Sequence, residues 1–282
     1  MMIRRITYVL AAFMLMSVSS YGWGGYEHTV IAYAAQDHLT ENAARNIRYY
    51  LDQPIYEYAE WMDWIPMKGY PGYEITGSGH CSVMWSDGTV ARTAAVEDGE
   101  GDGFGWMERV ISTMRNHREL PDSLVVLHLR CFIHMMGDFH CPGHVIIMDR
   151  PETGTTVPVD VWKDNPIWKK IFYQTSANKK TIHWLWDTPL QHLHGDWTFE
   201  QWRQELDVWT PAQRQDAIKG DLEGWLMENS KIAKEVLSFS KPDTMYTETY
   251  YTGRALEITY LQMRLAIYRM AEVLNACFDY EK

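Results

Sequence analysis

The sequence predicts an all-α fold, built as a single mainly helical domain that follows a short N-terminal leader. Three observations support this prediction. Polar capping residues precede several apolar segments, apolar residues near the C-terminus recur at helical spacing, and segments with strand character are scarce. We find no internal repeat and no linker rich in proline or serine, so one domain over residues 23–282 is the simplest organisation.

Residues 1–22 have the order of a cleavable signal peptide. Two arginines precede an apolar run from Ile6 to Val18, and small and polar residues follow it. The run is shorter than the stretch of about 20 residues that spans a membrane comfortably, so an uncleaved anchor is the alternative. Cleavage after Gly22 would make Trp23 the first residue of a secreted or periplasmic chain.

The chain is acidic, and this charge limits the surfaces that it offers to a partner. Its formal net charge is −11 at pH 7, and loss of the two leader arginines lowers it to −13. This balance argues against nucleic-acid binding through a basic surface, because Lys and Arg contacts to phosphate normally supply that affinity. Bound metal ions would provide positive charge locally.

Four cysteines leave two interpretations open for an exported chain. They could form two disulfides, with three pairings available, or remain free and buried thiols. The four are Cys81, Cys131, Cys141 and Cys277.

Helix start signals occur in both halves of the chain. Thr40 precedes a helical pattern at 41–51, and Ser123 precedes an apolar helical pattern at 124–140. Small hydroxyl residues at these positions accept hydrogen bonds from the free backbone N–H groups of the first turn. We therefore expect a helix to begin directly after each of them.

The C-terminal half carries stronger helix signals. Thr198 and Gln201 have capping-box spacing. The Thr-Pro-Ala-Gln sequence at 210–213 predicts a helix that begins there and runs toward Leu237. Residues 255–278 keep apolar side chains at helical spacing for about six turns, which predicts a long C-terminal helix.

Strand and loop signals are few. Residues 154–162 are the best strand candidate, although Pro158 removes one backbone donor from any sheet ladder. Residues 97–105 are rich in Gly and Asp and predict an exposed loop. They lack the regular ligand positions and closing Glu of a calcium-binding loop.

The histidines carry the strongest chemical signal. His134 and Asp138 are four residues apart in a helical pattern, so both side chains leave the same face and can hold one ion. His144 follows after Pro142 and Gly143, which end the helix and allow the chain to turn back. Taken alone, this pair also fits a surface ion pair or a core histidine.

The same pattern recurs further along the chain. His183 and Asp187 are again four residues apart, within an apolar and aromatic segment. Upstream, Asp63 lies among aromatic residues and His80 lies in a glycine-rich turn. Buried carboxylates need a partner, and a metal ion is the partner that neighbouring histidines indicate.

In this order, the motifs resemble the S-one/P-one nuclease family of secreted, trinuclear-zinc nucleases. The shared features are a leader that ends before Trp23, a His five residues later, Trp-x-Asp, a lone His after a glycine turn, His-x3-Asp-x5-His and His-x3-Asp. The C-terminal helix also resembles the last helix of the family. The resemblance covers nearly the whole mature chain and implies the helical fold of zinc phospholipase C and P-one nuclease.

The resemblance implies three zinc ions and nine ligand residues. In this family the first residue of the mature chain binds metal through its free amino group and its carbonyl oxygen. The implied sites are Trp23, His28 and one oxygen of Asp138; Asp63, His80, His134 and the other oxygen of Asp138; and His144, His183 and Asp187. Asp63 and Asp138 are assigned as the catalytic residues.

The implied function is that of a secreted zinc-dependent phosphodiesterase or endonuclease. It would hydrolyse single-stranded DNA or RNA to 5′-phosphorylated products through a metal-activated hydroxide. We expect a monomer that takes single-stranded nucleic acid or nucleotides as substrate and does not insert stably into membranes after cleavage.

The residues around the implied metal site depart from the family pattern. Pro66 stands where members usually carry an arginine that contacts phosphate. Residues 81–83 follow His80 where members place an aromatic residue and an acid, and residues 149–158 with an insertion at 160–180 replace a Gly-Gly-Asn segment. The metal site is retained while the residues that would contact substrate are changed.

Two alternative functions are therefore open. One is a zinc-dependent phospholipase C, which shares the fold and the three ions. The short spacing between Trp23 and His28, and Asp187 in place of Glu, favour the nuclease branch. The other is a zinc-binding relative that has lost catalysis, which Pro66 suggests.

Overall fold

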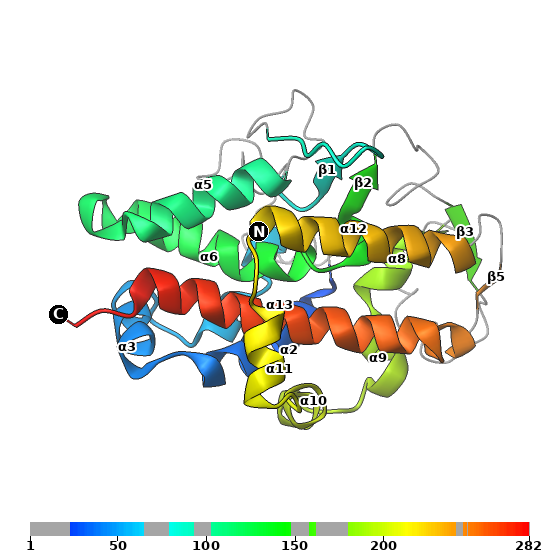
Figure 1. Cartoon of the computed structure of the whole chain (residues 1–282). Coiled ribbons are helices and arrows are strands. Elements are labelled where there is room, and N and C mark those ends of the chain that lie inside the picture. Colours follow the sequence, from blue (N-terminus) through cyan, green and yellow to red (C-terminus); the bar gives the residue numbers. More distant parts are fainter. Residues whose placement is uncertain are drawn as a thin grey trace, which may run out of the picture.

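A computed structural model of the chain describes residues 23–64, 79–92, 103–147, 158–161, 180–240, 245–246 and 248–281. The described elements are mainly α-helices, which confirms the predicted fold class (Figure 1). The predicted leader and Pro66 lie outside the described residues, as does most of the insertion at 160–180.

The first half of the chain contains four described α-helices, five short 3-10 helices and two strands. They are α2 (Gly25–Ala35), η1 (Gln36–His38), α3 (Glu41–Tyr50), η2 (Ile55–Tyr58), η3 (Trp61–Trp64), β1 (Ser82–Met84), α5 (Gly103–Arg115), η4 (His117–Glu119), α6 (Asp122–Asp138), η5 (Pro142–His144) and β2 (Val145–Ile147).

The second half adds six described α-helices, one short 3-10 helix and three short strands. They are β3 (Pro158–Val161), β4 (Lys180–Thr181), α8 (Ile182–Asp187), α9 (Pro189–His194), α10 (Phe199–Leu206), α11 (Pro211–Ala217), α12 (Leu222–Phe239), β5 (Met245–Tyr246), η7 (Glu248–Tyr251) and α13 (Arg254–Phe278).

The C-terminal helix α13 organises the core. It runs through the middle of the molecule and packs against α2, α3, α5 and α6 (Figure 1). Its apolar side chains are buried at the predicted helical spacing, including Ile258, Met263, Ile267, Met270 and Leu274. Their burial removes apolar surface from water, which is the main favourable term in holding these helices together.

Helix α6 lies against α5 and α13 and carries the first predicted metal motif. It begins at Asp122, directly after Pro121, so the predicted start after Ser123 is wrong. Ser123 lies inside the first turn, and no side-chain cap bond is formed at the N-cap residue, Pro121. The helix therefore begins two residues earlier than the serine suggested.

Three other predicted caps are confirmed. The hydroxyl of Thr40 accepts from the N–H of Ala43 at 3.1 Å, at the start of α3. Thr198 with Gln201 forms the predicted capping box at α10, and Thr210 forms a second one at α11. In each case a backbone donor that the helix leaves free is satisfied locally.

The helix predicted from Thr210 toward Leu237 is two helices. Helix α11 ends at Ala217, and Gly220 adopts φ of +89°, in the left-handed region. Asp221 then caps α12, accepting from the N–H of Gly224 at 2.9 Å. The glycine permits a backbone turn that other residues rarely adopt, and the second cap restarts the helix.

The strands are short and form two small sheets. In the first, β1 pairs in parallel with β2, with Ser82 opposite Val145. In the second, β3 is antiparallel to β4 and parallel to β5. The predicted strand at 154–162 is therefore confirmed over Pro158–Val161, with its proline at the first position, where a missing N–H is tolerated.

One feature differs from the sequence prediction, and another decides between two alternatives that the sequence left open. The end of the predicted exposed loop at 97–105 is buried, because Gly103, Phe104 and Gly105 form the first turn of α5. All four cysteines are free thiols, so no disulfide is formed. Within the described ranges, no helix is long and apolar enough to cross a membrane.

Gly220 supplies a test of the break between α11 and α12. Replacement of Gly220 by Ala should lower the free energy of unfolding by about 1–2 kcal/mol, because a Cβ atom disfavours the left-handed conformation. Gly220→Asn is the matched control, since Asn tolerates this region, and it should lose clearly less. Equal stability of all three chains in urea unfolding would contradict this account of the turn.

Candidate metal centre

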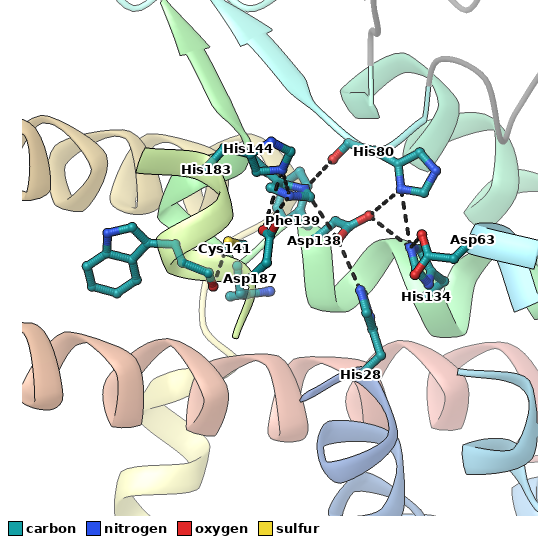
Figure 2. A network of polar contacts seen from close by, with 12 residues as sticks. His28, Asp63, His80, His134, Asp138, Phe139, Cys141, His144, His183 and Asp187 are labelled. Carbon is teal, nitrogen blue, oxygen red and sulfur yellow. Dashed lines mark hydrogen bonds and ion pairs between the residues drawn. The ribbon is translucent and has the colours of Figure 1, made fainter. Parts of the chain in front are cut away.

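Helix α6 places a carboxylate at the centre of a ring of imidazoles. His134 and Asp138 lie one turn apart on its inner face, and both are almost fully buried. Asp138 is within 3.3 Å of four histidines, which come from α2, the loop before β1, α6 itself and η5 (Figure 2). Segments far apart in sequence therefore meet at one side chain.

The two oxygens of Asp138 divide these histidines into two groups. Oδ1 lies 3.1 Å from His28 Nε2 and 3.3 Å from His144 Nδ1. Oδ2 lies 2.9 Å from His80 Nδ1 and 3.2 Å from His134 Nε2. A carboxylate with imidazole nitrogens near each of its oxygens has the geometry of a group shared between two ions.

Asp63 joins the second group. Its Oδ1 lies 3.7 Å from His134 Nε2, and His80 Nδ1 is 3.2 Å from the same nitrogen. Ligand atoms of Asp63, His80 and His134 lie within 4.8 Å of one another, and so do those of His28, His134 and Asp138. Both sets have the size and the donor types of a metal site.

A third group lies on the other side of Asp138, where α8 meets η5. His144 Nε2 and His183 Nε2 are 2.5 Å apart, and each lies 3.5 Å from Asp187 Oδ1. The sulfur of Cys141 also lies within 4.8 Å of ligand atoms of His144 and Asp187. From the sequence, Cys141 was expected only to be part of a disulfide or a free thiol.

Backbone carbonyls fix the orientation of two of the imidazoles. His134 Nδ1 lies 2.7 Å from the carbonyl oxygen of Ala59, and His144 Nδ1 lies 2.9 Å from that of His80. A carbonyl only accepts hydrogen bonds, so the proton sits on Nδ1 in both rings. Each Nε2 then faces the cluster and is the atom that would bind a metal ion, with loss of any proton that it carries.

Several buried atoms of the cluster form no hydrogen bond to the described residues, although His28 and Asp138 are in ion-pair contact. They are both ring nitrogens of His28, Oδ1 of Asp138 and Oδ1 of Asp187. A buried polar atom without a partner costs about 1–3 kcal/mol, and burying a lone charge costs more. Nitrogen and oxygen donors of this kind suit Zn²⁺, so these residues fit the metal that the sequence predicts.

The electrostatics of the third group support this fit. Burial, strengthened by the charges of Asp138 and Asp63, raises the pKa of Asp187 well above its usual value. Burial also lowers the pKa of His144 to about 4 and that of His183 well below its usual value. Neutral imidazoles are ready to bind metal, whereas an ionised Asp187 needs a nearby positive charge.

The second group differs because its charges compensate each other. Burial alone would lower the pKa of His134, but the carboxylates of Asp138 and Asp63 outweigh it and raise that pKa to about 9. Burial alone would raise the pKa of Asp138, but His144, His134 and His28 hold it well below its usual range. Asp138 therefore stays ionised and available as a ligand.

Glycines allow close approach of the segments that carry the rings, a role that no sequence pattern indicated. A Cβ atom on Gly137 would lie 2.5 Å from His28 Nδ1, and one on Gly143 would lie 3.1 Å from the Cα of His183. A Cβ atom on Gly103 would lie 2.8 Å from the carbonyl oxygen of Cys81, beside His80. The His28 ring thus packs directly against the backbone of Gly137.

A pair of buried amides holds the turn between Asp138 and His144. Asn229 of α12 donates to the carbonyl oxygens of Phe139 at 2.9 Å and Cys141 at 3.2 Å. Gln262 of α13 in turn donates to the Asn229 side chain. No sequence signal marks these two residues, because a single polar residue on an apolar helix face has many explanations.

The N-terminal segment lies beside Asp187. Trp23 is fully buried, and the N–H of Gly24 donates to the carbonyl oxygen of Asp187. Glu27, also fully buried, accepts from the N–H groups of Leu190 at 3.0 Å and Gln191 at 3.4 Å. These contacts tie the start of α2 to the end of α8 and to the first turn of α9, so the first predicted ligand lies near the cluster.

The structure therefore assembles the predicted residues. It brings together the side chains of His28, Asp63, His80, His134, Asp138, His144, His183 and Asp187. Trp23 is placed next to this group through its neighbour Gly24. Pro66 and residues 162–179, which were singled out as departures near the substrate, lie outside the described residues.

Comparison with known proteins agrees with this arrangement. A family model described as S1/P1 Nuclease matches residues 23–279, and the match begins at the residue predicted to open the mature chain. No curated protein matches the chain significantly. Because the matched region covers nearly the whole sequence, the chain belongs to the S1/P1 nuclease family, and this membership supports a nuclease or phosphodiesterase function.

Proposed function

We propose that this chain is a zinc-dependent nuclease that hydrolyses single-stranded DNA or RNA to 5′-phosphorylated products. The observation that carries the proposal is the Asp138 carboxylate, whose two oxygens face imidazoles from separate segments. Family membership supports the reaction class, and the buried nitrogen and oxygen donors support zinc.

The residues that would hold zinc are the nine that the sequence predicts. They form three sets: Trp23, His28 and Asp138; Asp63, His80, His134 and Asp138; and His144, His183 and Asp187. When bound, zinc supplies Lewis-acid chemistry that acidifies water and stabilises the negative charge of a phosphoryl group in displacement. Cys141 is a further donor beside the third set.

The side chains contribute orientation and exclusion of water. Asp138 stays ionised among the imidazoles, and the carbonyls of Ala59 and His80 keep the protons of His134 and His144 on Nδ1. Most of the cluster is buried, so its charges act in a medium of low polarity, where electrostatic interactions are stronger. Asp63 and Asp138 are the proposed catalytic carboxylates.

Substrate preference follows from the depth of the cluster. Its side chains lie at 14% exposure or less, so a phosphodiester must enter a recess to reach them. A flexible single strand can bend into such a recess more easily than a stiff duplex can. The positive charge of three bound ions would offset the acidic character of the chain near the phosphate.

The cellular context completes the proposal. Residues 1–22 would act as a cleaved secretion signal, and residues 23–282 would form the mature domain, acting as a monomer outside the cytoplasm. Cleavage would have a chemical purpose, because it would create the free amino group of Trp23.

Metal dependence and substrate are tested together. Mature protein purified with zinc should contain about three zinc ions, and chelation should abolish hydrolysis and lower the melting temperature, because metal binding is coupled to folding.

Single-stranded DNA or RNA should be cut faster than duplex DNA of the same sequence. Hydrolysis of phosphatidylcholine instead would favour the phospholipase alternative, and folded, zinc-loaded protein without any activity would favour the non-catalytic one.

Gly137 provides a test of the first proposed zinc site. Gly137→Ala should displace the His28 ring and lower hydrolysis by about ten- to a hundredfold, with loss of bound zinc. Alanine favours helix more than glycine does, so helix propensity does not predict this loss. The double change with His28→Ala should be no worse than His28→Ala alone. An additional loss of zinc in the double variant would show that Gly137 acts by another route.

The role of the terminal amine can be tested without changing any side chain. A chain that begins with a retained methionine before Trp23 carries an amide at that nitrogen, which no longer offers a lone pair to a metal ion. It should fold but hold about two zinc ions rather than three, because His28 and Asp138 alone provide too few ligands for the zinc ion of the first set. The matched chain beginning at Trp23 is the control. Three zinc ions and full activity in the extended chain would refute this role.

A further inference from the structure

Arg130 lies on α6 one turn before His134, and its guanidinium covers the segment that carries Asp63. The guanidinium carbon is 4.7 Å from the ring centre of Tyr58 and 5.6 Å from that of Trp61. Trp61 opens η3, which contains Asp63. Cation–π contacts of this kind hold a charged group in a fixed place without neutralising it.

Among the residues that the structure describes, no carboxylate pairs with the guanidinium of Arg130. Its Nε atom is buried without a hydrogen-bond partner, and Arg130 forms no hydrogen bond or ion pair within the described part of the chain. The nearby carboxylate of Asp52 accepts from the hydroxyl of Tyr58. By contrast, Arg214 and Arg269 also lie over aromatic rings, and each pairs with a carboxylate. A fixed, unpaired cation in an acidic protein is suited to an anionic ligand.

The position of Arg130 relates it to substrate. Within the cluster, His80 has the most exposed side chain, at 14%; those of His183, Asp63 and Asp187 are 9%, 8% and 5% exposed, and those of His28, His134, Asp138 and His144 are 1% exposed or less. Figure 2 shows Asp63 and His80 at the same end of the cluster, opposite His183 and Asp187. A phosphodiester that enters past Asp63 would therefore extend along the side where Arg130 lies.

We propose that Arg130 binds the backbone phosphate next to the scissile one in a single-stranded substrate. This inference rests on the proposed nuclease function and identifies a binding residue for it. The rings of Tyr58 and Trp61 cover the flat face of the guanidinium. Its terminal N–H groups point outward at the edge, where they can donate to two phosphate oxygens. The contact serves binding, so it acts on strand affinity and takes no part in bond cleavage.

The test is Arg130→Gln, with Arg118→Gln as the matched control. Arg118 lies 3.6 Å over the ring of Tyr280, and η4 places it before the start of α6, about 25 Å along the helix from Asp138. Both changes remove one positive charge from an aromatic contact. Initial rates are measured on single-stranded DNA oligonucleotides over a range of salt concentrations, together with melting temperature in zinc buffer.

Arg130→Gln should raise KM about tenfold, the effect of one lost charged hydrogen bond, while kcat changes less than twofold. The slope of log KM against log salt should fall by about 0.7, the value for one single-strand phosphate contact. Arg118→Gln should leave both quantities unchanged. Arg130→Lys keeps the charge but loses the paired N–H donors of the guanidinium, so it should keep the salt slope and show an intermediate KM. This variant replaces Arg130→Gln in the test if Arg130→Gln does not fold.

Three results would overturn the inference. They are equal KM and salt slope in the two glutamine variants, a fall in kcat without a change in KM, and loss of the salt slope in Arg130→Lys. The second would mean that Arg130 only holds the Asp63 segment in place. If the unaltered chain fails to cleave single strands, the proposed function fails, and binding of the same labelled oligonucleotide then decides the inference. Weaker binding by Arg130→Gln than by Arg118→Gln would support it, and equal binding would refute it.

Discussion

The contact on which the rest of the structure depends is that between the Asp138 carboxylate and the imidazoles around it. A charge buried to this degree is tolerated only where opposite charge or hydrogen-bond donors surround it. Here α2, the loop before β1, α6 and η5 each contribute one ring. The positions of these elements are therefore tied to one side chain at the end of a central helix.

This requirement explains features that would otherwise be costly. Gly137 reduces the helix propensity of α6, but only a residue without a Cβ atom leaves room for the His28 ring. Asn229 and Gln262 place polar groups in an apolar interior, and they are tolerated because they satisfy one another and the carbonyls that follow Asp138. The helix propensity lost at Gly137 and the polar groups buried at Asn229 and Gln262 are therefore explained by the geometry of the cluster that these residues maintain.

The sequence predicted the parts of this arrangement that depend on local spacing. The pair His134 and Asp138 and the caps at Thr198 and Thr210 follow rules that operate within one or two turns. Helix α2 was not predicted, because it is buried on nearly all sides and so lacks an apolar face with a polar one opposite. Asn229 could not be predicted either, since its partners lie about 90 residues away and only tertiary packing brings them together.

The small sheet of β1 and β2 shows how a short element can set the geometry of a site. Both strands begin close to a residue of the cluster, since β2 begins directly after His144 and only Cys81 separates His80 from β1. The parallel register, with Ser82 opposite Val145, brings the carbonyl oxygen of His80 to 2.9 Å from His144 Nδ1. A slip of one residue would turn the side chains of one strand to the opposite face and remove this bond. The three-residue pairing therefore joins the second group of the cluster to the third, and it fixes which nitrogen His144 offers to a metal ion.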